Sequence, residues 1–174
     1  MTRVAELADR LAIERNVGDF AHALDLGRWD LLDRVFTADA RIGFGGRSMS
    51  LEEAKGWLRR ELSDPGVRGY LHMVGNLRIT LMGDTADSIA HVFAPLEMVT
   101  AGEVRLGFNG IWYGWRHVRT QTGWRIAGSL DQWARTKPDW QPGFYGWITP
   151  PYPAAADWSA PLPANDRTEG GVND

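Results

Sequence analysis

The spacing of hydrophobic residues along this sequence changes near Tyr70, from the spacing of helices to the alternation of strands. Before that point, apolar residues recur at intervals of three and four, which predicts helices. The predicted helices span residues 3–25, 29–36 and 51–62, and a short strand is expected at residues 40–44. The alternating part predicts four strands, at residues 70–81, 86–99, 103–119 and 124–134. Helices followed by an antiparallel meander predict an α+β fold, with the helices packed on one face of a curved sheet.

Two local signals support the helix bounds. Gly27 follows the first apolar stripe, and glycine can adopt the left-handed conformation that ends a helix. Ser50 and Glu53 have the spacing of a capping box, in which each side chain bonds to the other residue's backbone N–H. The third helix should therefore begin at residue 51.

The composition narrows the function. The chain has 174 residues, a net charge of −3 and no cysteine. A small negative net charge gives no sign of a surface that binds nucleic acid or an anionic membrane. The absence of cysteine excludes thiolate chemistry. The sequence has no glycine-rich phosphate loop, nucleotide fingerprint, nucleophile elbow or metal-ligand spacing. Nine tryptophans are many for this length, and aromatic side chains commonly line small-molecule pockets.

The chain divides into one domain and two C-terminal segments. Residues 1–136 contain all the predicted helices and strands. Residues 137–163 hold seven of the nine prolines and several tryptophans, which predicts an extended segment that docks on the domain or on a neighbouring subunit. Residues 164–174 are expected to be disordered. The N-terminus lacks an apolar signal core and no segment is long and apolar enough to span a membrane, so we expect a cytoplasmic protein.

His72 is the first candidate for acid–base chemistry. Leu77, Ile79 and Leu81 mark the apolar face of its strand, and His72 has the opposite parity. A β-bulge at Gly75–Asn76 would reverse the register and turn His72 to that inner face. Without a bulge, His72 would be an ordinary polar residue facing solvent.

Asp25 lies at the end of the first predicted helix, at the edge of its apolar stripe. A carboxylate there could face a pocket between helix and sheet, accept a hydrogen bond from one imidazole nitrogen and leave the other free as a base. It could equally be a solvated helix-terminal residue. His22, one turn earlier, could also reach this site. No metal site is predicted from these residues, because no local ligand motif accompanies them.

Further candidates lie on the later strands. On the second long strand, His91 and Glu97 share one face, and we expect His91 at a subunit interface and Glu97 in the pocket. Apolar residues on both faces of this strand predict that a second subunit covers one of them. His117 is expected to be an exposed strand-end residue. The remaining candidates for lining the pocket are Asn109, Trp112, Tyr113 and Asp131.

Four segments together resemble a SnoaL-like member of the NTF2-like superfamily. They are ALDLGRWD at residues 23–30, FTADA at 36–40, HMVGNLRI at 72–79 and GWRIAG at 123–128. The resemblance covers about residues 4–134. It implies a cone in which a curved antiparallel sheet wraps round three helices and encloses a pocket.

Within the superfamily, the sequence is most similar to scytalone dehydratase, hexachlorocyclohexane dehydrochlorinase and bile-acid dehydratase. These are cofactor-free lyases, typically homotrimers, whose catalytic His and Asp correspond to His72 and Asp25. Leu24 and Glu97 stand where scytalone dehydratase has a tyrosine and a second histidine, and Phe20 stands where the dehydrochlorinase has a lysine. We therefore include Phe20 and Leu24 among the expected substrate-binding residues.

The resemblance and the dyad together predict a cofactor-independent lyase. Its reaction would be a dehydration, deformylation or dehydrohalogenation of a small hydrophobic, aromatic or cyclic molecule. An isomerase or cyclase would share the same proton abstraction and is the alternative enzyme. A non-catalytic ligand-binding protein is the alternative from another class. The resemblance also implies a homotrimer, with a dimer as the second possibility.

Overall fold

The computed structural model describes residues 2–44, 47–133 and 144–145. In these residues the helices are α1 (Arg3–Asp25), α2 (Trp29–Val35) and α3 (Leu51–Leu62). The strands are β1 (Phe36–Phe44), β2 (Arg47–Ser50), β3 (Val67–Tyr70), β4 (Met73–Met82), β5 (Thr85–Thr100), β6 (Glu103–Thr120), β7 (Gly123–Trp133) and β8 (Phe144–Tyr145). The α+β prediction is confirmed.

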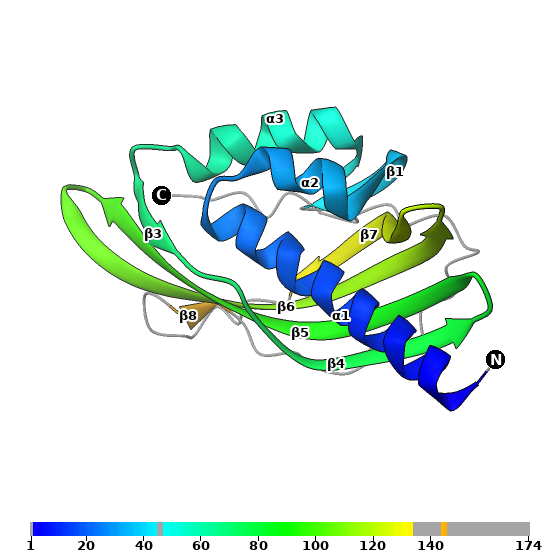
Figure 1. Cartoon of the computed structure of the whole chain (residues 1–174). Helices are drawn as coiled ribbons and strands as arrows, with labels where there is room; N and C mark the ends of the chain where they lie inside the picture. Colours follow the sequence, from blue (N-terminus) through cyan, green and yellow to red (C-terminus); the bar gives the residue numbers. More distant parts are fainter. Residues whose placement is uncertain (1, 45–46, 134–143, 146–174) are drawn as a thin grey trace.

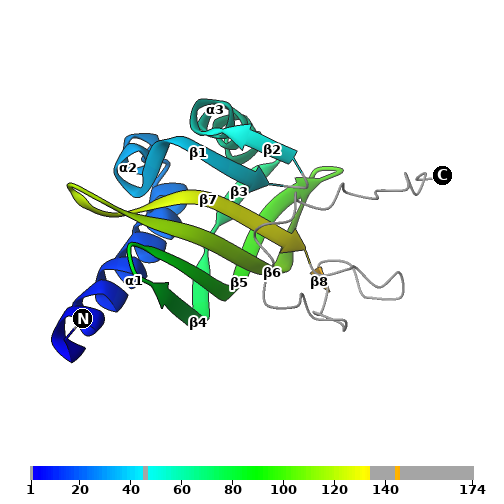
Figure 2. The ribbon, with the colours of Figure 1, turned by 90° about the vertical axis from the view of Figure 1, so that its right-hand side faces the viewer.

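All these strands belong to one curved, unclosed sheet. Its order is β2-β1-β7-β6-β5-β3, with β4 also paired to β5 and β8 to β6. The meander of β4 to β7 is antiparallel as expected, but β1 pairs with β7 and β8 pairs with β6 in parallel, so the sheet is mixed. The helices lie on one side of it: α1 crosses β4 to β6 diagonally, and α2 and α3 lie beside β1 (Figures 1 and 2).

The helix ends agree with the local signals. Ser50 and Glu53 form the predicted capping box, and α3 begins at Leu51. Gly27 has a φ of +61°, and the N–H groups of Gly27 and Arg28 donate to the carbonyls of Leu24 and Ala23. This pair of bonds is the Schellman motif, which satisfies the last carbonyls of α1. It fixes the position of Asp25, the last residue of the helix.

The strand bounds needed three corrections. The break expected at residues 37–39 is absent, because β1 runs without interruption from Phe36 to Phe44. The single strand expected at residues 70–81 is two strands, which are separated at Leu71 and His72. β2 was not expected, and it pairs with β1 in an antiparallel ladder.

The core lies between the helices and the inner face of the sheet. Phe20 from α1 packs against Phe36, Phe44, Tyr113 and Trp115, with ring centres 5.8–6.2 Å apart. A smaller cluster of Ile13, Ala86 and Trp124 lies under the first half of α1.

The expectation for His117 is wrong, because this side chain is completely buried. β6 continues to Thr120, and His117 shares the parity of Ile111, Tyr113 and Trp115, which all point inward beneath the helices.

Most of the two C-terminal segments lies outside the described residues. The expectations for residues 137–163 and 164–174 therefore stay predictions, apart from β8. The backbone of Phe144 and Tyr145 pairs in parallel with Phe108 and Asn109 of β6, so the chain returns to the sheet there. Of the described helices, none has the length and apolar character needed to cross a bilayer.

Candidate active site

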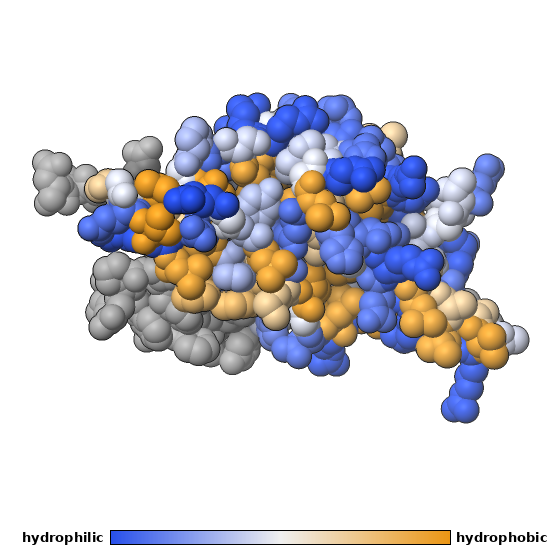
Figure 3. Space-filling view, turned by 60° about the vertical axis from the view of Figure 1, so that its left-hand side comes forward, coloured by the Kyte–Doolittle hydropathy of each residue, from blue (hydrophilic) through white to orange (hydrophobic). Residues whose placement is uncertain are grey.

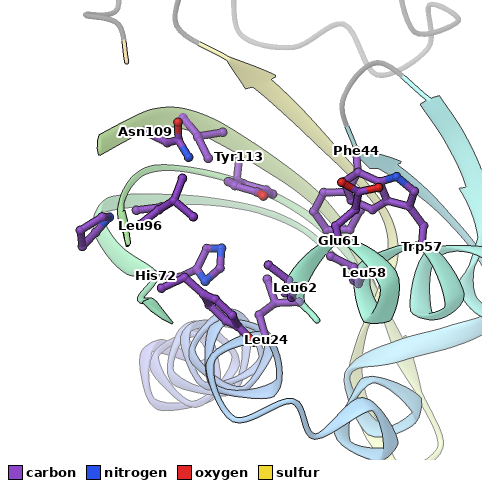
Figure 4. A pocket seen from close by; sticks show the side chains of 14 residues that line it. Leu24, Phe44, Trp57, Leu58, Glu61, Leu62, His72, Leu96, Asn109 and Tyr113 are labelled. Carbon is purple, nitrogen blue, oxygen red and sulfur yellow. The ribbon is translucent and has the colours of Figure 1, made fainter. Parts of the chain in front are cut away.

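A cavity of about 100 Å³ opens between the C-terminal end of α1, helix α3 and the inner face of the sheet. Its wall is mostly aliphatic and aromatic, with a few polar groups (Figure 4). The lining residues are Leu24, Phe44, Trp57, Leu58, Glu61, Leu62, Tyr70, His72, Ala94, Pro95, Leu96, Asn109, Ile111 and Tyr113. An apolar hollow with few polar groups is the usual form of a small-molecule site.

The bulge predicted at Gly75–Asn76 is confirmed, and it explains why His72 points inward. The register of β4 on β5 shifts between Gly75 and Arg78, and Asn76 has a φ of +54°. Asparagine tolerates this left-handed conformation better than most residues. The shift puts His72 on the same face as Leu77, despite their opposite parity. His72 therefore lines the cavity.

Asp25 meets His72 at the cavity wall. Its Oδ1 lies 2.7 Å from His72 Nδ1, and the His72 backbone N–H donates to both carboxylate oxygens, at 3.0 and 3.1 Å. Both side chains are only 13% exposed. The Asp25 carboxylate thus contacts both the ring and the backbone N–H of His72, so the ring cannot turn without losing its bond to Asp25.

This geometry determines the available chemistry. A carboxylate beside Nδ1 favours the tautomer with hydrogen on that nitrogen, which leaves Nε2 with a free lone pair. It also stabilises the imidazolium that forms when Nε2 takes a proton. The pair is therefore suited to general-base catalysis on a molecule held in the cavity.

Other polar groups line the same cavity. Tyr113 from β6 and Asn109 point toward the space in front of His72, and Glu61 from α3 lies at the far side, beside Phe44 and Trp57 (Figure 4). Tyr70 lies next to His72, with ring centres 6.2 Å apart. Burial and the nearby charge of Asp25 both raise the pKa of Tyr70, so its hydroxyl keeps its proton at neutral pH.

The structure brings together five of the residues singled out from the sequence. Besides His72 and Asp25, the residues Leu24, Asn109 and Tyr113 lie at the cavity.

Four others lie elsewhere, and the side chain of Asp131 is outside the part that the structure describes. Phe20 is buried in the aromatic core behind the cavity wall. His22 is exposed on α1. Glu97 and Trp112 belong to the outer face of the sheet, where Glu97 lies 3.9 Å from Arg68 and Trp112 contacts His91 edge-on. Their parity, opposite to that of the inward residues, explains this placement.

Several lining residues were not singled out from the sequence. Glu61 and Trp57 come from α3, whose face toward the sheet could not be placed relative to the strands. Tyr70 could have been predicted from the sequence, because it stands two residues before His72 and alternate residues of a strand share one face. In the described part of the chain, no group of three or more His, Asp or Glu side chains is arranged to hold a metal ion.

Comparison with known proteins identifies the family. The model of the SnoaL-like domain matches residues 5–129, and the chain therefore belongs to the SnoaL-like family. The uncharacterized protein Rv2910c of Mycobacterium tuberculosis is 43% identical over 135 residues, which cover 75% of this chain and 89% of that protein. The resemblance described from the sequence is confirmed.

Solved structures confirm the fold. A hexachlorocyclohexane dehydrochlorinase of Novosphingobium barchaimii aligns with a TM-score of 0.67 at 18% identity, over 86% of this chain and 100% of that chain. A protein of Novosphingobium aromaticivorans assigned as a scytalone dehydratase aligns with a TM-score of 0.68 at 19% identity, over 86% and 99%. An NTF2-like protein with a cystatin-like fold from the same species has a TM-score of 0.63 at 20% identity, over 78% and 88%.

Proposed function

We propose that this protein is a cofactor-independent lyase that acts on a small hydrophobic, cyclic or aromatic molecule. The observation that carries the proposal is the 2.7 Å contact between Asp25 and His72 Nδ1 at the wall of an apolar cavity. Structural neighbours that are named as a dehydrochlorinase or assigned as a dehydratase support it.

The proposed reaction is an elimination. Nε2 of His72 takes a proton from a carbon of the substrate, and the electron pair of that C–H bond forms a new C=C bond. The leaving group departs from the adjacent carbon with its own bonding pair. A hydroxyl leaves as water when its oxygen takes up the proton that His72 removed from carbon, which leaves His72 neutral again. Chloride leaves without a proton, and His72 then releases its proton to solvent. Asp25 stabilises the imidazolium in the meantime, and the Tyr113 hydroxyl assists the leaving group.

The test uses β-hydroxy ketones, beginning with 3-hydroxycyclohexanone and 3-hydroxy-1-indanone, with the enone product followed by NMR. We expect turnover by the wild-type chain and a loss of about 10²–10⁴-fold in kcat for His72→Ala. Asp25→Asn keeps an oxygen acceptor but removes the charge, so its loss should also be large. His22→Ala is the matched control, because His22 is an exposed histidine one turn from Asp25.

The outcomes separate the candidate functions. Full activity in both His72→Ala and Asp25→Asn would overturn the dyad. A product of unchanged mass that depends on His72 would indicate an isomerase. Binding without turnover of any compound would favour a non-catalytic ligand-binding protein.

We also propose that the protein is a homotrimer that buries the outer face of the sheet. This face carries exposed Met73, Phe93, Val104 and Leu106, and Phe93 stacks on Phe108 at 5.5 Å. Figure 3 turns the left-hand side of Figure 1 toward the reader and shows hydrophobic residues, in orange, on that surface. Exposed apolar patches of this kind mark interaction sites. The number three comes from the resemblance to trimeric lyases.

Light scattering tests the assembly. We expect a trimer for the wild-type chain and smaller species for Phe93→Asp and Leu106→Asp. Leu11→Asp is the matched control, because Leu11 is an apolar residue on α1 with 56% exposure, close to the 55% of Leu106. A monomeric wild-type chain contradicts the proposal.

A further inference from the structure

We propose that the cavity selects uncharged ligands that carry an oxygen acceptor, and that the Tyr70 hydroxyl is the donor that binds this oxygen. The inference deepens the proposed function, because it rests on the cavity beside His72 being the substrate site. It concerns binding, so it can be tested before the substrate is known.

The position of Tyr70 is the first observation. β3 pairs with β5 up to Tyr70 and Leu96, and the chain then passes through Leu71 to His72. Tyr70 and His72 therefore belong to one short stretch of the cavity wall, with their rings 6.2 Å apart and inclined at 69°. A group that is bound by Tyr70 lies close to the atoms that face His72.

The hydroxyl of Tyr70 is a free donor in an apolar setting. Among the described residues it has no hydrogen-bond partner, although the Tyr70 ring meets the His72 ring edge-on and the charge of Asp25 lies near. A half-buried hydroxyl without a partner gains a hydrogen bond when a ligand supplies an acceptor. An uncharged carbonyl or ether oxygen fits this donor.

The charges round the cavity argue against an anionic ligand. None of the lining residues in the described part of the chain is a lysine or arginine. Glu61 lines the cavity, and the carboxylate of Asp25 lies directly behind His72. A bound carboxylate would therefore lose its hydration and meet two negative groups, with no lysine or arginine among the described lining residues to pair with.

A donor beside the base also suits the proposed reaction. When His72 removes a proton from the carbon next to a carbonyl group, negative charge develops on the carbonyl oxygen. A hydrogen bond from Tyr70 to that oxygen would be stronger in the transition state than in the bound ketone.

Three probes of one size test the selection with the full-length protein. Acetophenone has an oxygen acceptor, ethylbenzene has none, and benzoate is an anion. Their dissociation constants are measured by ligand-observed NMR. We expect acetophenone to bind at least about ten times more tightly than benzoate. Tyr70→Phe should weaken acetophenone by about 2–12-fold, the range of one hydrogen bond, and leave ethylbenzene unchanged. Glu61→Gln should strengthen benzoate and leave acetophenone unchanged.

Each contrary result would overturn one part of the proposal. Equal weakening of acetophenone and ethylbenzene in Tyr70→Phe would show that Tyr70 only packs, and unchanged acetophenone binding would show that it is not the donor. Benzoate that binds as tightly as acetophenone would overturn the charge selection. If no probe binds at millimolar concentration, the cavity is not a ligand site. A failed lyase assay with intact probe selectivity would overturn the catalytic proposal alone.

Discussion

His72 and His117 both point to the inner side of the same sheet, yet their surroundings differ in every respect that matters for chemistry. His72 faces a cavity and has a carboxylate on Nδ1. His117 is completely buried, and its Nε2 lies 2.7 Å from the Ser88 hydroxyl. Burial lowers the pKa of His117 to about 4, so it is neutral in the folded protein at neutral pH.

The difference follows from where α1 ends. Along most of its length, α1 covers the sheet with fully buried residues such as Ile13 and Val17. The helix stops at Asp25, while β5 and β6 continue beyond it (Figure 1). In that uncovered stretch the inner face of β5 offers Ala94, whose small side chain leaves room. A closed core and an open site are thus two ends of one helix–sheet layer.

Replacing each histidine by alanine gives the largest expected effect on this comparison. His117→Ala leaves a cavity in a packed region and should lower the free energy of unfolding by about 3–4 kcal/mol, as for other large buried side chains. His72→Ala widens an existing cavity and removes the ring bond to Asp25, whose carboxylate keeps its bonds from the backbone N–H of residue 72, so the loss should be smaller, about 1–2 kcal/mol. Urea unfolding followed by tryptophan fluorescence measures both.

The activity assay provides the reverse contrast. His117→Ala protein that remains folded should keep its turnover of β-hydroxy ketones, whereas His72→Ala should lose it. A loss of stability in His72→Ala as large as in His117→Ala would contradict the comparison, since it would make His72 a core residue rather than a cavity residue.

Much of the inner surface could be predicted from the sequence because its signals are local. The capping box at Ser50 and the glycine at position 27 fix helix ends through bonds between near neighbours. The bulge at Asn76 was detectable because the apolar parity of the strand changes across it. The fold class follows from the change in hydrophobic spacing along the chain, and the placement of Asp25 and His72 follows from the end of α1 at Gly27 and from the bulge.

The rest could not be predicted because it depends on contacts between distant segments. Nothing near Glu61 in the sequence shows that α3 turns this residue toward the strands. Glu97 was expected in the cavity by its spacing along the strand, but the strand's parity puts it on the outer face. His117 lies two residues before a hairpin loop, which is a common place for exposed residues, but the first half of α1 packs on the sheet there and buries it.

An effect smaller than that of His117→Ala concerns the titration of His117 alone. Lowering the pH should reduce the free energy of unfolding through this histidine by on the order of 3 kcal/mol. The pKa of this histidine is about 4 in the folded chain and takes its ordinary value of 6.5 when the chain unfolds. Between these values the unfolded chain binds more protons, so the free energy of unfolding should fall as the pH is lowered from about 6.5 to about 4. Above that window His117 contributes no pH dependence.

His117→Leu is the variant that isolates this effect, because leucine fills similar space and does not titrate. Subtracting its unfolding free energy from that of the wild type at each pH cancels the other histidines. Asp9 does not interfere, since its hydrogen bond with Arg119 holds its pKa at about 2 and its stabilisation is lost only below its ordinary value of 3.8. If the two proteins lose stability in parallel between pH 6.5 and 4, burial does not hold His117 neutral, and the closed core at that end of the sheet admits water.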